Sequence, residues 1–206
     1  YPLFDSIELY QSGKKNNPVF RGGDIYPFNE RPIEYRNSVI PVTQNESEYS
    51  LYFLKLKSKS AMSIPVYAYT FEAFYGKILK EQMILGFYYG TMLVLFLYNF
   101  FLFISTKNKN YLYYILYIGC YLLFQFSLNG YSFQYIWPNA VWWENVSMPF
   151  FIYLAYFWAL VFSRSFLGLK NNSNVLYFFY FSLLGWSVIG SLLVFAIDNN
   201  PLNMKS

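Results

Sequence analysis

The stretch MILGFYYGTMLVLFLYNFFLFIST, residues 83–106, decides the fold of this chain. It contains no charged residue, and at 1.5 Å per residue a helix of this length measures about 36 Å, enough to cross a hydrocarbon core of about 30 Å. Lipid offers the backbone no hydrogen-bond partner, so a segment inside it must satisfy its own amides by forming a helix. The stretch therefore predicts a transmembrane helix over about 82–105.

Three similar uncharged stretches follow, at about 111–130, 146–163 and 175–197. The whole chain is 56% hydrophobic and only 13% charged, whereas soluble domains average roughly a quarter charged residues. The pattern predicts a membrane α-helical bundle over residues 82–206, with four transmembrane helices present and the lipid bilayer as its surroundings.

The distribution of Lys and Arg among the loops predicts the orientation. The loop 106–110 carries two lysines and the loop 164–174 carries Arg164 and Lys170, whereas the loop 131–145 has neither Lys nor Arg. Basic loops stay in the cytoplasm, so the region before the first helix is expected outside the cell inner (plasma) membrane. This topology requires an export signal upstream of Tyr1, and we expect the chain to be the middle part of a longer protein.

Residues 1–75 show strand and turn patterns. Apolar and polar residues alternate over 52–57, which predicts a half-buried strand, and residues 64–71 predict a second strand with Pro65 at an edge or bulge. Short strands separated by Gly and Asn turns indicate a partial all-β jelly roll or sandwich. A hinge is expected at 76–81, between this domain and the helices.

Several kinds of chemistry lack their usual residues in this sequence. There is no histidine and Cys120 is the single cysteine, so we expect no metal site, no cofactor and no disulfide. The formal net charge of +4 is spread over short loops rather than gathered in a basic stripe, and a nucleic-acid partner is not expected. No nucleophile elbow or phosphate loop is present, so we expect no enzyme activity in this part of the protein.

The candidate ligand-binding residues lie in one short stretch of the first region. They are Asp24, Arg31, Tyr35 and Arg36, where charged groups flank aromatic rings. Aromatic platforms with hydrogen-bonding charges are typical of sites for carbohydrates and other small solutes. The alternative interpretation is a turn at Asp24 and solvated arginines. Glu144, in the loop 131–145, is expected to be solvated as well.

The candidate helix-packing residues are Gly86, Gly90 and Asn99 in the first predicted span. A G-x-x-x-G spacing lets another helix approach closely, and an amide in lipid needs a hydrogen-bond partner. Packing within the bundle and packing of a homodimer are both compatible with this spacing.

Two groups of short motifs follow the order of a known family. They are residues 23–28, 31–32, 35–36, 52–57 and 64–67 in the first region, and 86–90, 97–99, 111–114, 130 and 135–138 in the second. Taken together, these motifs resemble the bacterial seven-transmembrane receptors with diverse intracellular signalling modules. The resemblance implies a jelly-roll sensor for carbohydrate-like or other small ligands and a bundle of seven helices. It also implies a cytoplasmic cyclase, histidine kinase, diguanylate cyclase or phosphatase as the output.

The sequence thus favours a signal-transduction receptor that senses an unknown extracytoplasmic small ligand. Two alternatives stay open. A transporter or channel subunit would place a charged residue inside a span. A membrane-embedded transferase would place acidic residues or histidines near the headgroups, where Glu144 is the one candidate.

Overall fold

The structure is a computed structural model that describes residues 4–12, 17–42, 50–58, 64–168 and 174–198. The chain divides into two compact units. The first, which we call the composite unit, contains residues 1–66 and 126–145. The second, the helical unit, contains residues 67–125 and 146–206.

A three-stranded antiparallel sheet forms the β part of the composite unit. Its strands are β1 (Ser6–Gln11), β2 (Phe20–Gly22) and β3 (Tyr52–Lys57), in the order β2-β1-β3. Ile7 pairs with Gly22 on one side and Leu56 on the other, and Leu9 pairs with Phe20 and Leu54. Ile7 and Leu9 are buried, because alternate residues of the central strand point to one face.

The strand predicted at 52–57 is confirmed as β3. The second strand, predicted at 64–71, is wrong: residues 64–70 have no regular structure, and Phe71 begins a helix. Thr70 is the N-cap of this helix and its Oγ1 accepts a hydrogen bond from the Ala73 amide at 3.4 Å. Pro65 lacks an amide hydrogen, so this segment is poorly suited to pair as a strand. The sheet confirms a β domain ahead of the helices, while the jelly roll stays a prediction.

Gly23 fixes the turn that follows β2. Its φ of 127° lies in the region that side chains rarely adopt, and a Cβ at this position would clash with the Asp5 carbonyl oxygen. The next amide, that of Asp24, donates to the Phe4 carbonyl at 2.8 Å. Glycine is therefore required here to direct Asp24 back against β1.

Four helices dominate the rest of the described chain: α1 (Phe71–Thr106), α2 (Lys109–Leu128), α3 (Val141–Leu167) and α4 (Asn174–Asp198). Each contains a stretch long and apolar enough to cross a membrane. All four predicted spans are confirmed, with ends that differ by one to eleven residues. The ends differ because polar residues are tolerated where a helix leaves the lipid. A short π-helix, η2 (Ser132–Ile136), lies between α2 and α3.

Residues 76–81, expected as a hinge, are helical and lie inside α1. The Lys77 ammonium lies 3.8 Å from the Glu81 carboxylate one turn later and 4.8 Å from the centre of the Tyr69 ring. Pairs spaced by four residues support a helix, and Gly76 is tolerated there at a cost of about 1 kcal/mol. The helix α1 therefore continues without a break from the charged residues 76–81 into the uncharged stretch that follows them.

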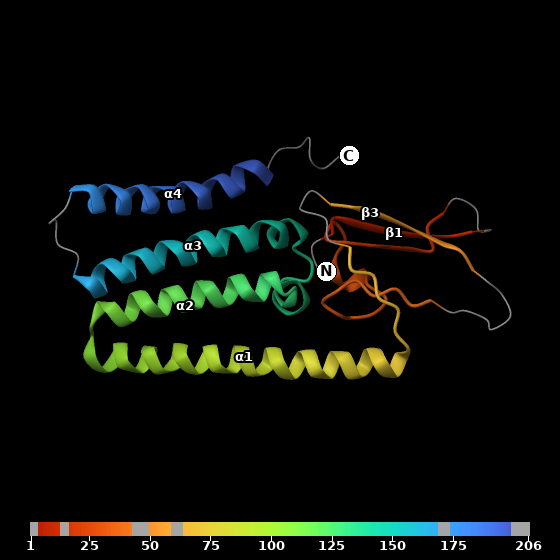
Figure 1. Cartoon of the computed structure of the whole chain (residues 1–206), viewed down its shortest axis with the longest axis horizontal. Helices are drawn as coiled ribbons and strands as arrows, with labels where there is room; N and C mark the ends of the chain where they lie inside the picture. The colour runs from red at the N-terminus through yellow and green to blue at the C-terminus, as the bar shows by residue number, and fades with distance from the viewer. Residues whose placement is uncertain (1–3, 13–16, 43–49, 59–63, 169–173, 199–206) are drawn as a thin grey trace. The chain divides into compact units, whose positions relative to one another are not determined.

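Within the helical unit the helices lie side by side in chain order (Figure 1). The Tyr89 hydroxyl of α1 donates to the Gln125 carbonyl of α2 at 3.1 Å. Tyr114 of α2 and Phe162 of α3 have ring centres 5.2 Å apart, and Phe150 of α3 and Phe195 of α4 are 5.3 Å apart. Aromatic pairs thus join each helix to the next from α2 onward.

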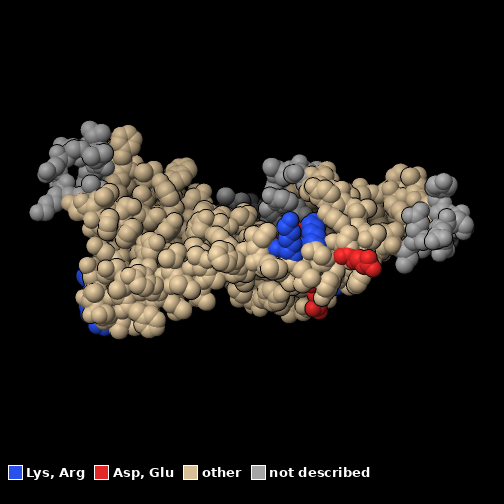
Figure 2. All heavy atoms as spheres, turned by 60° about the horizontal axis from the view of Figure 1, so that its bottom comes forward, with Lys and Arg blue, Asp and Glu red and all other residues tan. Residues whose placement is uncertain are grey.

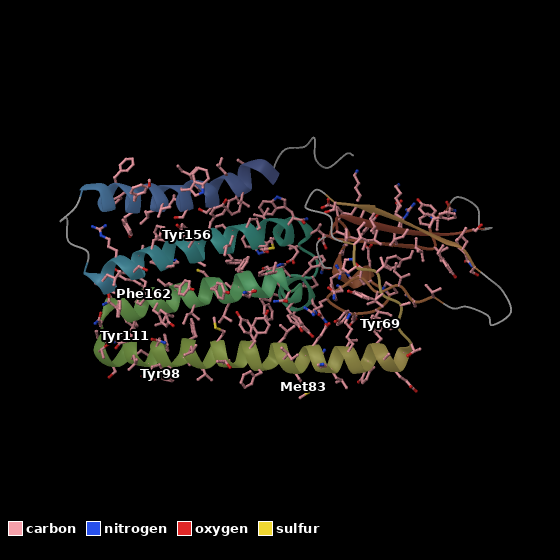
Figure 3. All side chains as sticks on the ribbon, viewed as in Figure 1. Tyr69, Met83, Tyr98, Tyr111, Tyr156 and Phe162 are labelled. Atoms are coloured by element: carbon pink, nitrogen blue, oxygen red, sulfur yellow. The ribbon has the colours of Figure 1, made fainter. Side chains whose placement is uncertain are left out.

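The outer surface of the helical unit is apolar. Much of the helical surface in Figure 2 is tan, the colour of residues other than Lys, Arg, Asp and Glu, and blue Lys or Arg spheres appear at its left end. Met83 and Tyr98 lie on the side of α1 away from α2 (Figure 3), with exposed fractions of 76% and 61%. Large exposed apolar side chains along a whole helix are expected where the surrounding solvent is lipid.

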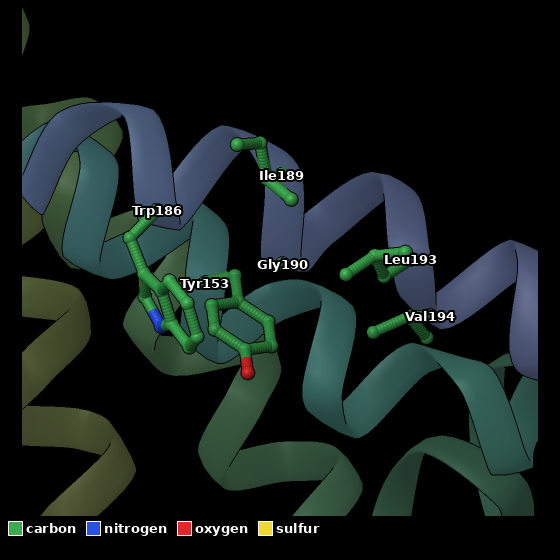
Figure 4. A pocket seen from close by; sticks show the side chains of 6 residues that line it. All are labelled: Tyr153, Trp186, Ile189, Gly190, Leu193 and Val194. Atoms are coloured by element: carbon green, nitrogen blue, oxygen red, sulfur yellow. The ribbon is translucent and has the colours of Figure 1, made fainter. Parts of the chain in front are cut away.

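Gly190 of α4 allows the Tyr153 ring of α3 to approach the α4 backbone closely. It lines an apolar cavity of about 130 Å³ together with Tyr153, Trp186, Ile189, Leu193 and Val194 (Figure 4). A Cβ at Gly190 would lie 2.5 Å from a carbon of the Tyr153 ring, whereas a Cβ at Gly185 would meet nothing within 4 Å. The two glycines of α4 are thus very different in their surroundings.

We predict that Gly190→Ala destabilises the helical unit by about 1–3 kcal/mol, because the Tyr153 ring must move out of its packed position. Gly185→Ala is the matched control, and it should be neutral or stabilising by up to about 1 kcal/mol through helix propensity. Thermal unfolding of the purified protein in detergent measures both. Equal melting temperatures for the two variants would contradict the close contact.

Candidate functional site

The segment between α2 and α3 packs against the N-terminal region to form the composite unit. The Phe28 amide donates to the Pro138 carbonyl at 2.9 Å, and the Asn29 side chain donates to the Asn139 side chain at 3.2 Å. The rings of Phe28 and Phe133 meet edge to face, 5.8 Å apart. We call residues 126–145 the α2–α3 segment. Backbone, polar and aromatic contacts all join it to the short 3-10 helix η1 (Phe28–Glu30).

Arg31 lies at the centre of this contact, with only 7% of its side chain exposed. Its guanidinium carbon is 4.8 Å from the centre of the Phe28 ring and 5.6 Å from that of Phe133. Rings from both parts of the unit thus face one cation, an arrangement that attracts a guanidinium to the negative ring faces.

The remaining contacts of Arg31 order the chain that follows it. Its Nη1 donates to the carbonyls of Tyr35, at 3.3 Å, and Arg36, at 3.0 Å. A guanidinium with several donors in one plane can hold a turn of backbone in this way. The buried Nε of Arg31 has no hydrogen-bond partner among the described residues. Arg31 therefore cross-links the turn 31–36 and the α2–α3 segment.

Asp24 is the acidic partner of Arg31, with its Oδ1 3.8 Å from Arg31 Nη2. Burial raises the pKa of Asp24 to about 8, and the charges of Glu144 and Asp5 add to this shift while that of Arg31 opposes it. Burial also lowers the pKa of Arg31. Near neutral pH this carboxyl group is thus poised to bind or release a proton.

Arg36 makes a second link to the α2–α3 segment. Its Nη1 donates to the Asn129 side-chain oxygen at 3.3 Å. Its guanidinium carbon lies 5.6 Å from the centre of the Tyr131 ring and 6.0 Å from that of Tyr35. Tyr35 is buried and Arg36 is half-buried.

Glu144 is not simply solvated, as the sequence suggested. The Trp137 indole donates to its Oε2 at 2.6 Å and the Ser132 hydroxyl donates to the same oxygen at 2.9 Å. The three residues belong to η2, the residue after it and the first turn of α3, so the hydrogen bonds close the α2–α3 segment on itself. The side chain lies close enough to Asp24 and Arg31 to influence the pKa of each.

The structure brings together the four ligand-binding candidates, Asp24, Arg31, Tyr35 and Arg36, around one guanidinium. The solvated arginine considered as an alternative is wrong for Arg31, which is buried. Sequence reasoning did not identify their partners Phe133, Asn129 and Glu144, which lie about a hundred residues further along the chain. These partners lie in or beside the loop between two uncharged spans, and the unusual aromatic and polar content of that loop is the sequence feature that could have pointed to them.

The helix-packing candidates have different surroundings. A Cβ at Gly86 or Gly90 would meet nothing within 4 Å, so no described helix packs closely at either position. Asn99 is buried, and its side chain donates to the Leu95 carbonyl of its own helix at 2.8 Å. The amide is thus satisfied within α1.

The described residues contain no group of three or more side chains that could hold a metal ion. The composite unit instead has a buried network of guanidinium, carboxylate and aromatic groups. Such a network can respond to charge or to movement.

Comparison with known families agrees with this organisation. Residues 81–204 match the family model described as 7TM diverse intracellular signalling. The chain belongs to this family. Residues 1–70 match a second model, described as 7TMR-DISM extracellular 2. No curated protein and no solved structure matches the chain.

The family confirms the resemblance drawn from the sequence, and the chain is a multi-pass membrane receptor with an extracellular N-terminal sensor domain and intracellular signalling. The composite unit supports the same topology independently. Two spans, α1 and α2, separate the sensor domain from the α2–α3 segment, so both lie on one side of the membrane. They are therefore able to form one unit, as observed.

We predict that Arg31→Met releases the α2–α3 segment of the receptor, because the carbonyls of Tyr35 and Arg36 lose their donor and the nearby carboxyl groups lose the cation that they face. Each buried acceptor left without a donor costs roughly 1–3 kcal/mol. Hydrogen exchange over residues 126–140, measured by mass spectrometry on the full chain in detergent, should become faster.

Arg21→Met is the matched control, since the Arg21 side chain is 59% exposed and lies 4.0 Å from Glu8 at the surface. It should leave the exchange of residues 126–140 unchanged. If hydrogen exchange over residues 126–140 were as slow in Arg31→Met as in Arg21→Met, Arg31 would not hold the unit together.

Proposed function

We propose that this chain is the sensing and membrane part of a bacterial inner-membrane receptor that binds an extracytoplasmic small ligand and relays its occupancy to a cytoplasmic output module. One observation carries the proposal: the sensor domain and the α2–α3 segment form a single packed unit. Because this segment is continuous with two spans, a change in the sensor domain has a covalent route into the membrane besides α1.

The relay requires two arrangements of the unit with different affinities for the ligand. A ligand that binds both arrangements equally shifts nothing, whereas one that prefers a single packing moves the population toward it. The cluster around Arg31 has the properties of a two-state contact, because packed side chains and ion pairs change discretely rather than continuously. Small movements of η1 would therefore reposition the ends of α2 and α3.

The ligand class that fits best is carbohydrate-like. Arg36 is half-buried, lies beside the rings of Tyr35 and Tyr131, and thus offers a donor next to aromatic faces. Such a combination suits the hydroxyl groups and apolar faces of a sugar. Asp24 and Arg31 are more deeply buried, and we assign them to positioning rather than to direct contact with the ligand.

A thermal-shift screen of the full chain in detergent, with a panel of mono- and disaccharides, tests this proposal. A ligand at a hundred times its Kd stabilises a protein by about 2.7 kcal/mol, so a binder should raise the melting temperature visibly. Arg36→Gln should abolish the shift, and Arg21→Gln, at an exposed position, should keep it.

The same sugars also separate a receptor from a transporter. Uptake of a labelled binding sugar into proteoliposomes containing the chain would favour transport and contradict the receptor proposal. Binding without uptake would support it. A panel in which no sugar binds would contradict the carbohydrate-like ligand and leave the family's receptor role in place.

The glycine face of α1 is our proposed contact for a homodimer. Gly86 and Gly90 have open space at their Cβ positions, and the neighbouring Phe87 is 80% exposed. Small residues spaced by four let helices approach closely in lipid. Repacking at this face would carry the signal between the two copies.

We predict that the double variant Gly86→Leu and Gly90→Leu lowers the cross-linked dimer fraction in lipid nanodiscs, because two large side chains fill the groove. Gly76→Leu, at another open glycine of α1 outside the uncharged stretch, should leave the fraction unchanged. An unchanged dimer fraction in the double variant would exclude this face as the dimer contact.

A further inference from the structure

Three charged groups from two distant stretches of the chain meet in the composite unit. Asp24 follows β2, Arg31 follows η1, and Glu144 lies in the first turn of α3. The Asp24 and Arg31 side chains are 10% and 7% exposed, with 3.8 Å between their nearest charged atoms. Glu144 acts electrostatically on both. We call these three groups the charged triad.

The charged triad is not balanced. One guanidinium faces two carboxylates, so with all three groups ionised the triad has a net charge of −1. An uncompensated charge away from water is costly, and a protein commonly avoids it by taking up a proton. A single proton on either carboxylate makes the triad neutral.

Asp24 is the carboxyl group that best accommodates this proton. Burial raises the pKa of Glu144 as well, but Glu144 accepts hydrogen bonds from Trp137 and Ser132 that oppose this shift. In the described part of the chain, no side chain or amide donates to the Asp24 carboxyl group in the same way. Among the described residues, the charged groups that act on Asp24 are Arg31 from the turn after η1, Glu144 from α3 and Asp5 from the residue before β1. Burial outweighs the attraction of Arg31, and it raises the pKa of Asp24 to about 8.

We propose that the proton is itself an input to this receptor: protonated Asp24 keeps the α2–α3 segment packed on the sensor domain, and loss of the proton loosens the contact. The proposal rests on the receptor function proposed above and adds a second signal to the small ligand. A change in extracellular pH would then alter the same contact through which ligand occupancy reaches α2 and α3.

The direction of the pH effect follows from linkage. Asp24 has a higher pKa in the packed unit than the value of 3.8 that it has in an unfolded chain. Between these values the packed state holds more protons than the open one, so its stability falls as pH rises. The contact is therefore tightest in mild acid and reaches its weakest state above about pH 8.

Distances between two spin labels measure the contact directly. The labels are placed at Lys57→Cys on β3 and Ala140→Cys in the α2–α3 segment, both exposed, in the full chain with Cys120→Ser in lipid nanodiscs. The pH is varied from about 5.5 to about 9, on both sides of the expected transition. The distance distribution should be narrow in mild acid and broaden as pH rises.

Two variants of the charged triad have different expected outcomes. Asp24→Asn keeps the shape of the side chain without its charge, and it should hold the narrow distribution at every pH. Glu144→Gln removes a charge that raises the pKa of Asp24, so it should move the transition to lower pH. Glu30→Gln, an exposed carboxylate on η1, is the control and should behave as the wild type does.

The proposal is overturned if the wild type shows no broadening, or if Asp24→Asn keeps the transition. Should Asp24→Asn fail to fold, an unchanged midpoint in Glu144→Gln overturns it instead. These outcomes are independent of the sugar screen. A distance change on adding a binding sugar at fixed pH, with no response to pH, would remove the proton input while the receptor function stands.

Discussion

The burial of the Arg31 guanidinium between Phe28 and Phe133 is the interaction on which the composite unit depends. A buried cation is stable only when its charge and its donors are satisfied. The carboxyl groups of Asp24 and Glu144 both act on this cation, so one ionised carboxylate of the two is enough to balance its charge. The carbonyls of Tyr35 and Arg36 accept two of the guanidinium's hydrogen bonds. The turn 31–36 and the ring of Phe133 must therefore stay in place together, which joins the sensor domain to the α2–α3 segment.

This constraint connects two regions that obey different physical rules. In the helical unit the outer side chains face lipid, and packing depends on aromatic pairs and on close approaches such as that at Gly190. In the composite unit the packing depends on charge and hydrogen bonds, because this part of the receptor is exposed to water. A signal that begins as a polar event outside can thus reach helices that contain no charged residue within their spans.

A buried ion pair has a function beyond stability when its balance is marginal. Replacing such a pair by apolar residues is often neutral for stability, so its presence suggests specificity or switching. Here the charge of the second carboxylate, Glu144, raises the pKa of Asp24, so that one proton decides whether the three charged groups are neutral or have a net charge of −1. Residues 81–204 assign the chain to a receptor family that combines an extracellular domain with intracellular signalling. In such a receptor, a proton-dependent contact in the extracellular part would act as an input.

Local patterns were enough to predict part of the site. Asp24, Arg31, Tyr35 and Arg36 lie within thirteen positions, so their grouping could be inferred from the sequence. Residues 64–70 show the limit of such patterns. Their apolar alternation resembles a strand, yet Thr70 caps α1 and Pro65 offers no amide hydrogen for pairing. Periodicity shows which side chains share a face, and it does not show whether a partner strand is available.

By itself the sequence determined the four spans, their direction across the membrane, the strand at 52–57 and the family, because lipid and the pleated strand impose constraints that each segment meets alone. Only the tertiary structure decided that Arg31 is buried, that Glu144 belongs with Asp24, and that α1 continues through residues 76–81. These features depend on contacts between positions as far apart as Asn29 and Asn139. Such contacts arise from the path of the whole chain, and no local pattern of residues specifies them.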